Sequence, residues 1–569
     1  MKRLRDAVAI LLLLSAVSLS WCQANHLWSI ADWKMPTAYD DAPRSDVIQH
    51  LAFIKAASDG NFVPFRSKMI PNLGAPGEAN WNDWPIVEEL QIFAAGMLGR
   101  AVGIFTALNI AVLLAHLLAA VTFYVVTRYW RASVEWAFAG ALAYGLAPYL
   151  FAQSPHHPLV EWCWHLPLFL VVWRWVSSEP GIAPGSRRFW VGLAIGALTG
   201  VQMVYYTAIF CQLVLLGALV MFIRNRAARP LVSALCIIGA AILAFALMNL
   251  DTWVYAWQHG SNPGALDRPF KWLEIYGLSV ANLFVPPLDH HWALFREFAR
   301  WHDKAAAQAD EGSYLGMVGV AAFLFLIGVS VVAAVRKRAD SIPMEAWQVL
   351  WLVLCFMSGG FNTIAGLFGF TLLRTGCRFS IVILAISLTF AVERLSVWGS
   401  RHRAASFAAA ICFVMLVIVD QVPSTPSNKD RQAIAAQVAS DRKFVADMEA
   451  ALPAGSTVFQ IPVMDYPESP LGELTAYDHF RPYLYSERLR FSFGTNKGRG
   501  DQDWAHELDH VSLDQVVEQV RARGFSAIYI NCKAYPGHSE DLLQALQSMT
   551  GGKIIRSDAG DLACVRLNQ

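Results

Sequence analysis

The chain has 569 residues, of which 55% are hydrophobic and only 16% carry a charge, and its formal net charge is +1. Soluble domains carry about 25% charged residues, so the composition excludes a wholly soluble protein. A net charge this close to zero also provides no global field for binding nucleic acid. The uncharged stretches are long enough to cross about 30 Å of hydrocarbon as helices. The sequence therefore predicts a mainly α-helical, polytopic membrane protein.

About eleven apolar segments are candidate membrane spans. Because backbone groups in lipid must be paired within their own segment, each is predicted to be a helix. The segments are 7–22, 102–127, 134–152, 160–176, 189–203, 207–223, 231–250, 317–335, 346–361, 379–396 and 405–420.

Basic residues occupy alternate gaps between these segments, at 2–5, 128–131, 174–188, 224–229, 336–338 and 394–403. Since basic loops are retained in the cytoplasm, we expect a cytoplasmic N-terminus in a bacterial inner membrane and an extracytoplasmic C-terminus. The first segment could instead be a signal peptide. Leu19-Ser20-Trp21-Cys22 is a poor cleavage site, which favours an uncleaved span.

This topology predicts a transmembrane domain over 1–420, with outer loops at 23–99 and 251–315, and an extracytoplasmic domain over 421–569. Helices alternating with strands indicate a small α/β sheet layer in the second domain. The expected helices are 428–451, 513–523 and 540–548, and the expected strands are 456–463, 527–531, 553–556 and 562–567. Cys532 and Cys564 lie beside strands, and their spacing does not decide whether they form a disulfide.

The first outer loop holds the candidate base. Asp46, Gln49 and His50 share one face if 46–58 is an amphipathic helix at the membrane surface. An aspartate near apolar surroundings has a raised pKa and is a better base. The alternative is an ordinary solvated loop acid.

A short outer turn between the third and fourth segments carries His156 and His157, followed by Glu161 and His165. Imidazoles at this position could bind phosphate or a metal ion. The alternative is interfacial anchoring together with the neighbouring tryptophans. No HExxH, CxxC pair or acidic cluster indicates a dedicated metal site.

Arg374 and Arg378 precede the tenth segment on the outer side, against the inside-basic pattern. An arginine fork suits phosphate because it bonds two oxygens at once, although both side chains could instead extend to ordinary lipid headgroups. Glu311 and Tyr314 lie in a Glu-Gly-Ser-Tyr-Leu-Gly stretch at the entry to the eighth segment, where a helix N-terminus favours an acid.

These motifs resemble, in their order, those of GT-C-type membrane glycosyltransferases, and most closely bacterial YfhO-like multispan proteins. The resemblance covers about 30–420 and rests on Asp-x-x-Gln-His with Asn-Leu-Gly-Ala-Pro, the outer His turn, Glu-x-x-Tyr-Leu-Gly and Arg-x-x-x-Arg-Phe. It implies an inverting transfer from a polyprenyl-phosphate sugar to an extracytoplasmic glycan or lipid, with Asp46 as base. Val47 stands where an acidic pair is common in that superfamily, so Asp40-Asp41 is the alternative base.

The same resemblance implies that Arg374, Arg378, His156 and His157 face the donor phosphate. The candidate residues for orienting the acceptor are Gln49, His50, Asp83, Glu88, Glu161, His165, Glu311 and Tyr314. No cofactor is required by the sequence, and a divalent cation is the one candidate. The other functions to consider are a flippase of lipid-linked glycan and a non-catalytic scaffold. Few ionisable residues lie inside the spans, which argues against translocation.

Overall fold

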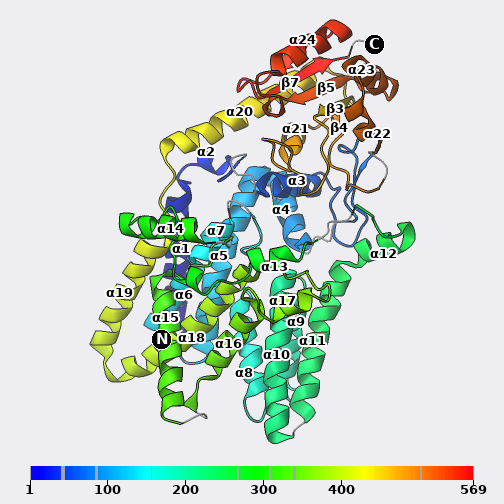
Figure 1. The fold of residues 1–569 in the computed structure, drawn as a ribbon. Coiled ribbons are helices and arrows are strands. Elements are labelled where there is room, and N and C mark those ends of the chain that lie inside the picture. Colours follow the sequence, from blue (N-terminus) through cyan, green and yellow to red (C-terminus); the bar gives the residue numbers. More distant parts are fainter. Residues whose placement is uncertain are drawn as a thin grey trace.

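The computed structural model describes residues 2–39, 45–83, 88–154, 157–226, 228–264, 268–306, 309–337, 341–499 and 503–567. A bundle of long helices carries a layer of short outer elements, and the C-terminal α/β domain lies on that layer (Figure 1). Asp40, Asp41 and His156 lie outside the described residues.

Each of the eleven predicted spans contains helix, which confirms the fold class, although 160–165 and 357–360 lie outside helices α8 (Leu166–Ser177) and α16 (Met344–Phe356). Seven helices in the described part are long and apolar enough to cross a membrane. The bundle consists of α1 (Lys2–Asn25), α5 (Ile104–Tyr129), α6 (Val134–Gly145), α7 (Pro148–Gln153), α8 (Leu166–Ser177), α9 (Arg187–Gly200), α10 (Val204–Asn225), α11 (Ala228–Met248), α15 (Gly316–Val335), α16 (Met344–Phe356), α18 (Ser380–Arg401) and α19 (Arg403–Gln421).

Two features of the bundle determine where its helices end beneath the outer layer of short elements. The predicted segment 134–152 is divided into α6 and α7 at Pro148, the first residue of α7, because proline tolerates only the first turn of a helix. Helix α18 is buried along most of its length and packs against α6, α8, α15, α16 and α19. Its outer end, preceded by the 3-10 turn η3 (Gly376–Phe379), is therefore held in the centre of the bundle.

The outer layer is formed by short elements from both outer loops and from the turn after α16. These elements are α2 (Ile30–Trp33), α3 (Val47–Ser58), β1 (Met69–Ile70), β2 (Ala79–Asn80), α4 (Glu89–Val102), α12 (Leu250–His259), α13 (Lys271–Ile275), η1 (Ala281–Leu283), α14 (Ala293–Ala305) and α17 (Phe361–Gly366). Strands β1 and β2 pair as a small antiparallel ribbon.

All seven elements expected in the C-terminal domain are present. The domain contains α20 (Asn428–Ala451), β3 (Thr457–Ile461), η4 (Asp478–Phe480), α21 (Arg481–Tyr485), β4 (Arg490–Phe491), α22 (Asp503–Glu507), η5 (Leu508–His510), α23 (Leu513–Ala522), β5 (Ala527–Asn531), η6 (Cys532–Ala534), α24 (Ser539–Thr550), β6 (Ile554–Arg556) and β7 (Leu562–Arg566). The sheet order is β4-β3-β5-β7-β6, with β3 parallel to β4 and β5, and β7 antiparallel to β5 and β6. Cys532 and Cys564 are not bridged.

The two faces of the sheet bury different partners. Alternate residues of a strand point to opposite faces, and in β5 Ile528 and Ile530 join the core formed with α23 and α24. Ala527 and Tyr529 join a second core, which contains Leu73 and residues of α3 and α20. The first outer loop and the C-terminal domain thus share one hydrophobic core.

The Asn-Leu-Gly-Ala-Pro motif of the first outer loop extends the sheet at its β4 edge. Phe491 N donates to Asn72 O at 2.9 Å, Ala75 N donates to Phe491 O at 2.9 Å, and Gly74 N donates to Phe493 O at 3.1 Å. Gly74 has φ +73°, and a Cβ there would lie 2.5 Å from Ala79 N. The motif therefore has a structural role, because it covers a sheet edge that would otherwise expose unpaired backbone groups.

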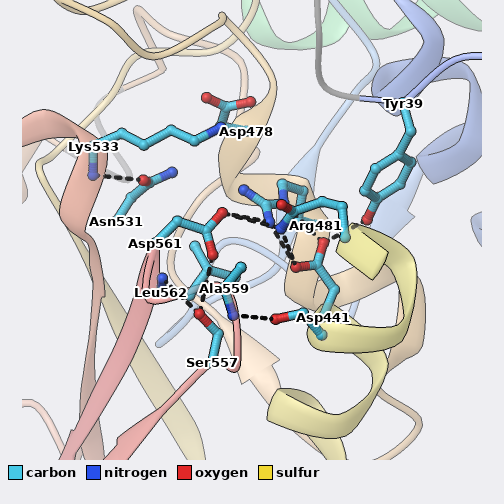
Figure 2. Close-up of polar contacts among 12 residues, drawn as sticks. Tyr39, Asp441, Asp478, Arg481, Asn531, Lys533, Ser557, Ala559, Asp561 and Leu562 are labelled. Atoms are coloured by element: carbon cyan, nitrogen blue, oxygen red, sulfur yellow. Dashed lines mark hydrogen bonds and ion pairs between the residues drawn. The ribbon is translucent and has the colours of Figure 1, made fainter. Parts of the chain in front are cut away.

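A buried charge network joins the same two parts (Figure 2). Arg481 is wholly buried and bonds Asp441 in a bidentate manner at 2.8 and 2.6 Å, and its Nη2 also donates to Asp561 at 2.8 Å. The hydroxyl of Tyr39 donates to Asp441 at 2.6 Å. This network connects α20, α21 and the turn before β7 to the segment of the first outer loop that leads toward Asp46.

We predict that Arg481→Met strongly destabilises the protein. The variant leaves two buried carboxylates without their shared cation, and breaking a buried pair costs about 3–5 kcal/mol. Thermal unfolding of the purified protein in detergent measures the loss. Arg523→Met is the matched control because Arg523 lies at the end of α23 and forms no ion pair within the described part of the chain. Equal melting temperatures for Arg481→Met and Arg523→Met would contradict this account.

Candidate active site

A cavity of about 870 Å³ lies where the outer ends of the spans meet the outer layer. Its wall combines residues that are far apart in the sequence and come from both outer loops, the α18 entry, the α19 end and the C-terminal domain. The charged and imidazole side chains on the wall are Asp46, His157, Asp289, His290, His291, Asp310, Glu311, Arg374, Arg378, Asp420 and Glu468. The cavity therefore brings together four residues that the sequence analysis singled out for catalysis or phosphate binding: Asp46, His157, Arg374 and Arg378.

Asp46 stands at the N-cap of α3 and points one carboxylate oxygen at His157. The distance from His157 Nδ1 to Asp46 Oδ2 is 2.8 Å. An ionised carboxylate only accepts hydrogen bonds, so Nδ1 carries the proton and donates it. About a third of the Asp46 side chain remains accessible within the cavity. His157 thus orients this carboxylate, a contact that the phosphate-binding role predicted for His157 did not include.

The pKa of Asp46 lies below its ordinary value, so the predicted rise is wrong. Burial raises this pKa, but the hydrogen bond and charge of His157, with further contributions from His50 and Arg378, outweigh burial. Burial lowers the pKa of His50, which favours the neutral imidazole. Asp46 is consequently ionised at neutral pH and can accept a proton.

Helix α3 spans the predicted residues, but the predicted amphipathic surface is wrong. Almost every side chain from Val47 to Ala57 is buried, because α21 and η4 of the C-terminal domain pack on the helix. Gln49 donates to the Tyr466 hydroxyl at 3.1 Å, and His50 Nδ1 donates to Asp46 O at 2.9 Å. These two side chains therefore hold α3 and its N-cap in place, while Asp46 alone of the three lines the cavity.

Arg378 is anchored at the buried entry to α18. Its Nε donates to Glu311 Oε2 at 2.7 Å, and only 9% of the residue is exposed. Burial raises the pKa of Glu311, but the charges of Arg378, His157 and Arg374 outweigh that effect and lower it. Gln153 supports the same segment by donating to Glu311 O at 2.6 Å. The pair fixes a guanidinium on the cavity wall.

Arg374 is a half-buried cation that interacts with Glu311 and Glu468 only through space. Among the described residues it has no hydrogen bond or ion pair, and its guanidinium lies 4.9 Å from the ring centre of Trp272. Burial and the nearby charge of Arg268 lower its pKa, although arginine remains charged in proteins. Neither acid bonds the guanidinium directly, so among the described residues its N–H groups remain open to an anion.

The structure separates several predicted acceptor-orienting residues from the cavity. Asp83 is held by Arg499, whose Nε donates to it at 2.6 Å, and by Asn262 at 3.2 Å. Glu88 precedes α4 and does not line the cavity. Glu161 and His165 are completely buried and are likewise absent from its wall. Their expected role at the acceptor stays a prediction that this cavity does not support, because long-range packing rather than local spacing decides where these side chains lie.

Tyr314 does not line the cavity but bonds a residue that does. Its hydroxyl donates to Asp420 Oδ1 at 3.0 Å, and Asp420 also accepts from Met317 N at 2.7 Å and contacts His290 Nε2 at 3.2 Å. Asp420 ends α19 on the cavity wall, and sequence reasoning missed it. An acid at the end of an apolar span is a recognisable signal.

Glu468 is another missed wall residue, as are Asp289, His290, His291 and Asp310. Glu468 reaches the cavity from the C-terminal domain and pairs with Arg268 at 2.6 Å. Nothing in its local sequence indicates this position.

Within the described ranges no three His, Cys, Asp or Glu side chains are grouped so as to hold a metal ion. The divalent cation remains a prediction. The wall instead supplies an oriented, ionised carboxylate and two guanidiniums, a set suited to proton abstraction beside an anionic group.

No family model and no curated protein matches the chain. Several solved structures resemble it at low identity. An oligosaccharyltransferase from Archaeoglobus fulgidus with a tethered acceptor peptide is 11% identical, with 98% of this chain and 74% of that chain covered and a TM-score of 0.44. ArnT from Cupriavidus metallidurans bound to undecaprenyl phosphate is 15% identical, with 98% of each chain covered and a TM-score of 0.43. At TM-scores below 0.5 such likenesses do not carry an activity over, and the site has to be judged on its own residues.

Proposed function

We propose that this protein is an integral membrane glycosyltransferase that moves a sugar from a polyprenyl-phosphate donor to an extracytoplasmic glycan or lipid. The observation that carries the proposal is the pairing, on one cavity wall, of ionised Asp46 with the cations Arg374 and Arg378. The cavity lies at the outer ends of apolar spans, where a lipid phosphate can enter from the headgroup region while its polyprenyl tail stays in the hydrocarbon.

The proposed reaction is a single displacement. Asp46 accepts the proton of the acceptor hydroxyl as its oxygen attacks the anomeric carbon. The bond from that carbon to the phosphate oxygen breaks, and the electron pair leaves with the polyprenyl phosphate. Arg374 and Arg378 stabilise the charge that develops there. Attack from the face opposite the leaving group inverts the anomeric configuration.

His157 is proposed to be a positioning residue. Its hydrogen bond fixes one oxygen of Asp46 and leaves the other for the acceptor. The same contact lowers the basicity of the carboxylate, so in this proposal the developing negative charge on phosphate, stabilised by arginine, supplies much of the driving force.

We further propose that the N-terminus is cytoplasmic and the C-terminal domain extracytoplasmic, in a bacterial inner membrane. The alternation of basic gaps supports this orientation. We predict that a reporter active only in the cytoplasm is silent when fused after Gln569 and active when fused after Arg401. The reverse pattern would place the cavity in the cytoplasm and remove the proposed function.

We predict that Asp46→Asn folds and binds donor but turns over slowly. The amide keeps size and hydrogen bonding without accepting a proton, and general-base losses are about 10²–10⁴-fold. The measurement is transfer of labelled sugar from a polyprenyl carrier by purified variants. In the parent, loss of activity on acidification is expected only below the ordinary pKa of 3.8, because the pKa of Asp46 is lowered. His157→Ala should move that acid limb to higher pH.

The control is Asp303→Asn, an identical change on exposed α14, which should leave transfer unchanged. Normal turnover in Asp46→Asn together with an inactive Asp40→Asn or Asp41→Asn variant would transfer the role of base to that pair. Normal turnover in all three variants would contradict the catalytic interpretation of this loop.

We predict that Arg374→Ala weakens binding of polyprenyl phosphate by roughly ten-fold to a hundred-fold, since a lost charge-assisted bond costs about 1.5–3 kcal/mol. Arg374→Lys should recover only part of it, because an ammonium lacks the planar fork. Arg378→Ala should weaken binding similarly, and Glu311→Gln separates that effect from loss of the Glu311 partner. Arg300→Ala on exposed α14 is the control. Full affinity in both alanine variants would make these arginines headgroup anchors.

A further inference from the structure

A second cavity, of about 1070 Å³, lies at the ends of the spans that face away from the C-terminal domain. Its wall is formed by the first turns of α1, α6 and α19 and by the last turns of α5 and α18. These helix ends lie on the opposite side of the bundle from the candidate active site (Figure 1). The proposed transfer reaction uses none of these residues.

The wall of this cavity is basic. Arg5, Arg128, Arg131 and Arg403 line it against two acids, Glu135 and Glu393, for a net charge of +2. Glu393 is already held by Arg174, whose Nη1 donates at 2.5 Å. Arg128 pairs with Asp6 at 2.7 Å. Glu393 is therefore paired with a cation that does not line the cavity, Asp6 offsets Arg128, and Glu135 forms no ion pair within the described residues.

Three of the four arginines are available. Arg5, Arg131 and Arg403 are exposed, and none has a hydrogen bond or ion pair from its side chain to the rest of the described chain. They come from α1, the α5–α6 turn and the start of α19, so three separate elements direct guanidiniums to one space. The turn itself is fixed, since Arg131 has φ +66° and its N–H donates to Arg128 O at 3.0 Å.

The N-terminus of α6 adds partial positive charge to the same wall. Ser133 is its N-cap, and the Ser133 side chain caps no backbone N–H. Its hydroxyl oxygen is buried and has no hydrogen-bond partner among the described residues. Free backbone N–H groups at a helix N-terminus favour an anion, and here they supplement three independent cations.

The cavity also has an apolar rim. Val397 on α18 and Phe407 on α19 line it and are exposed by 62% and 61%. Both lie on helices long and apolar enough to cross a membrane, so we expect the cavity to continue into a surface that faces acyl chains. A free anion would gain nothing from this rim, whereas the glycerol and first methylenes of a lipid would be covered by it.

We propose that this cavity binds the phosphate-bearing headgroup of an anionic membrane lipid, in the leaflet opposite the C-terminal domain. Basic pockets between transmembrane helices recognise such headgroups, and the guanidinium fork matches phosphate oxygens. The width of the wall, with three cations on three elements, suits a lipid carrying more than one phosphate. The group that the arginines bind in this proposal is a phosphate. The apolar rim favours a phosphate carried by a lipid over a phosphate on a soluble molecule.

The test uses the purified full-length chain reconstituted in nanodiscs of phosphatidylcholine doped with phosphatidylglycerol or with cardiolipin. Native mass spectrometry counts retained anionic lipids, and fluorescent lipid displacement gives relative affinity. The test variant is Arg131→Gln/Arg403→Gln. Arg401→Gln is the matched control because Arg401 is exposed at the same end of the bundle but does not line the cavity. Ser400→Trp fills the cavity without changing its charge.

We expect the parent and Arg401→Gln to retain anionic lipid, with cardiolipin preferred. The double variant should bind at least ten-fold more weakly, and Ser400→Trp should also lose retention. Sugar transfer is not the readout, so failure here is distinct from failure of the proposed function. If soluble glycerol phosphate displaces the lipid at similar concentrations, the claim that the cavity prefers a lipid over a soluble phosphate is contradicted. Equal retention by all variants would overturn the site.

Discussion

The position of the candidate base depends on the attachment of the first outer loop to the C-terminal domain. Backbone hydrogen bonds from Asn72–Ala75 extend the sheet at β4, and Tyr39 reaches the buried Asp441–Arg481 pair. Asp46 lies between these two attachments in the sequence. A flexible loop of this length would have to lose considerable entropy to hold one carboxylate still, and here the shared core and the buried network have already removed that freedom.

The pairing of charges on the cavity wall then decides which kind of ligand the cavity can bind. Asp46 is matched by His157 and Glu311 by Arg378, while Glu468 is matched by Arg268. Arg374 packs beside the Trp272 ring and forms no ion pair within the described residues, although Glu468 and Glu311 act on it through space. In surroundings of low dielectric constant this imbalance favours entry of one anionic group beside an ionised carboxylate. The reactive geometry is thus a consequence of which charges are paired and which are not.

Much of the fold could be predicted because the bilayer permits few solutions. Long apolar runs had to be helices, and strand and helix periodicity was clear in segments such as 527–531 and 428–451. Strand β4 was missed because it has only two residues and is defined by its partners. The break at Pro148 follows the local restriction of proline to the first turn of a helix, which the predicted segment 134–152 did not take into account. The burial of both faces of α3 depends on tertiary packing.

The sequence could predict a site residue only where its chemical type and its side of the membrane were sufficient to place it near the cavity. Asp46, Arg374, Arg378 and Glu311 meet on the cavity wall, since charged groups collect where spans end. Asp83 was misplaced because its partner Arg499 is 416 residues away. The pKa of Asp46 was wrong in sign because the hydrogen bond from His157 depends on a contact 111 residues distant. Such contacts leave no local pattern in the sequence.

The most direct test of the central claim is an experimental structure of the protein with bound polyprenyl phosphate. We predict density for the phosphate between Arg374 and Arg378, with the open oxygen of Asp46 facing the space beside it and the lipid tail leaving the cavity toward the bilayer. Phosphate density elsewhere, with the cavity wall unchanged and these arginines uncontacted, would contradict the account.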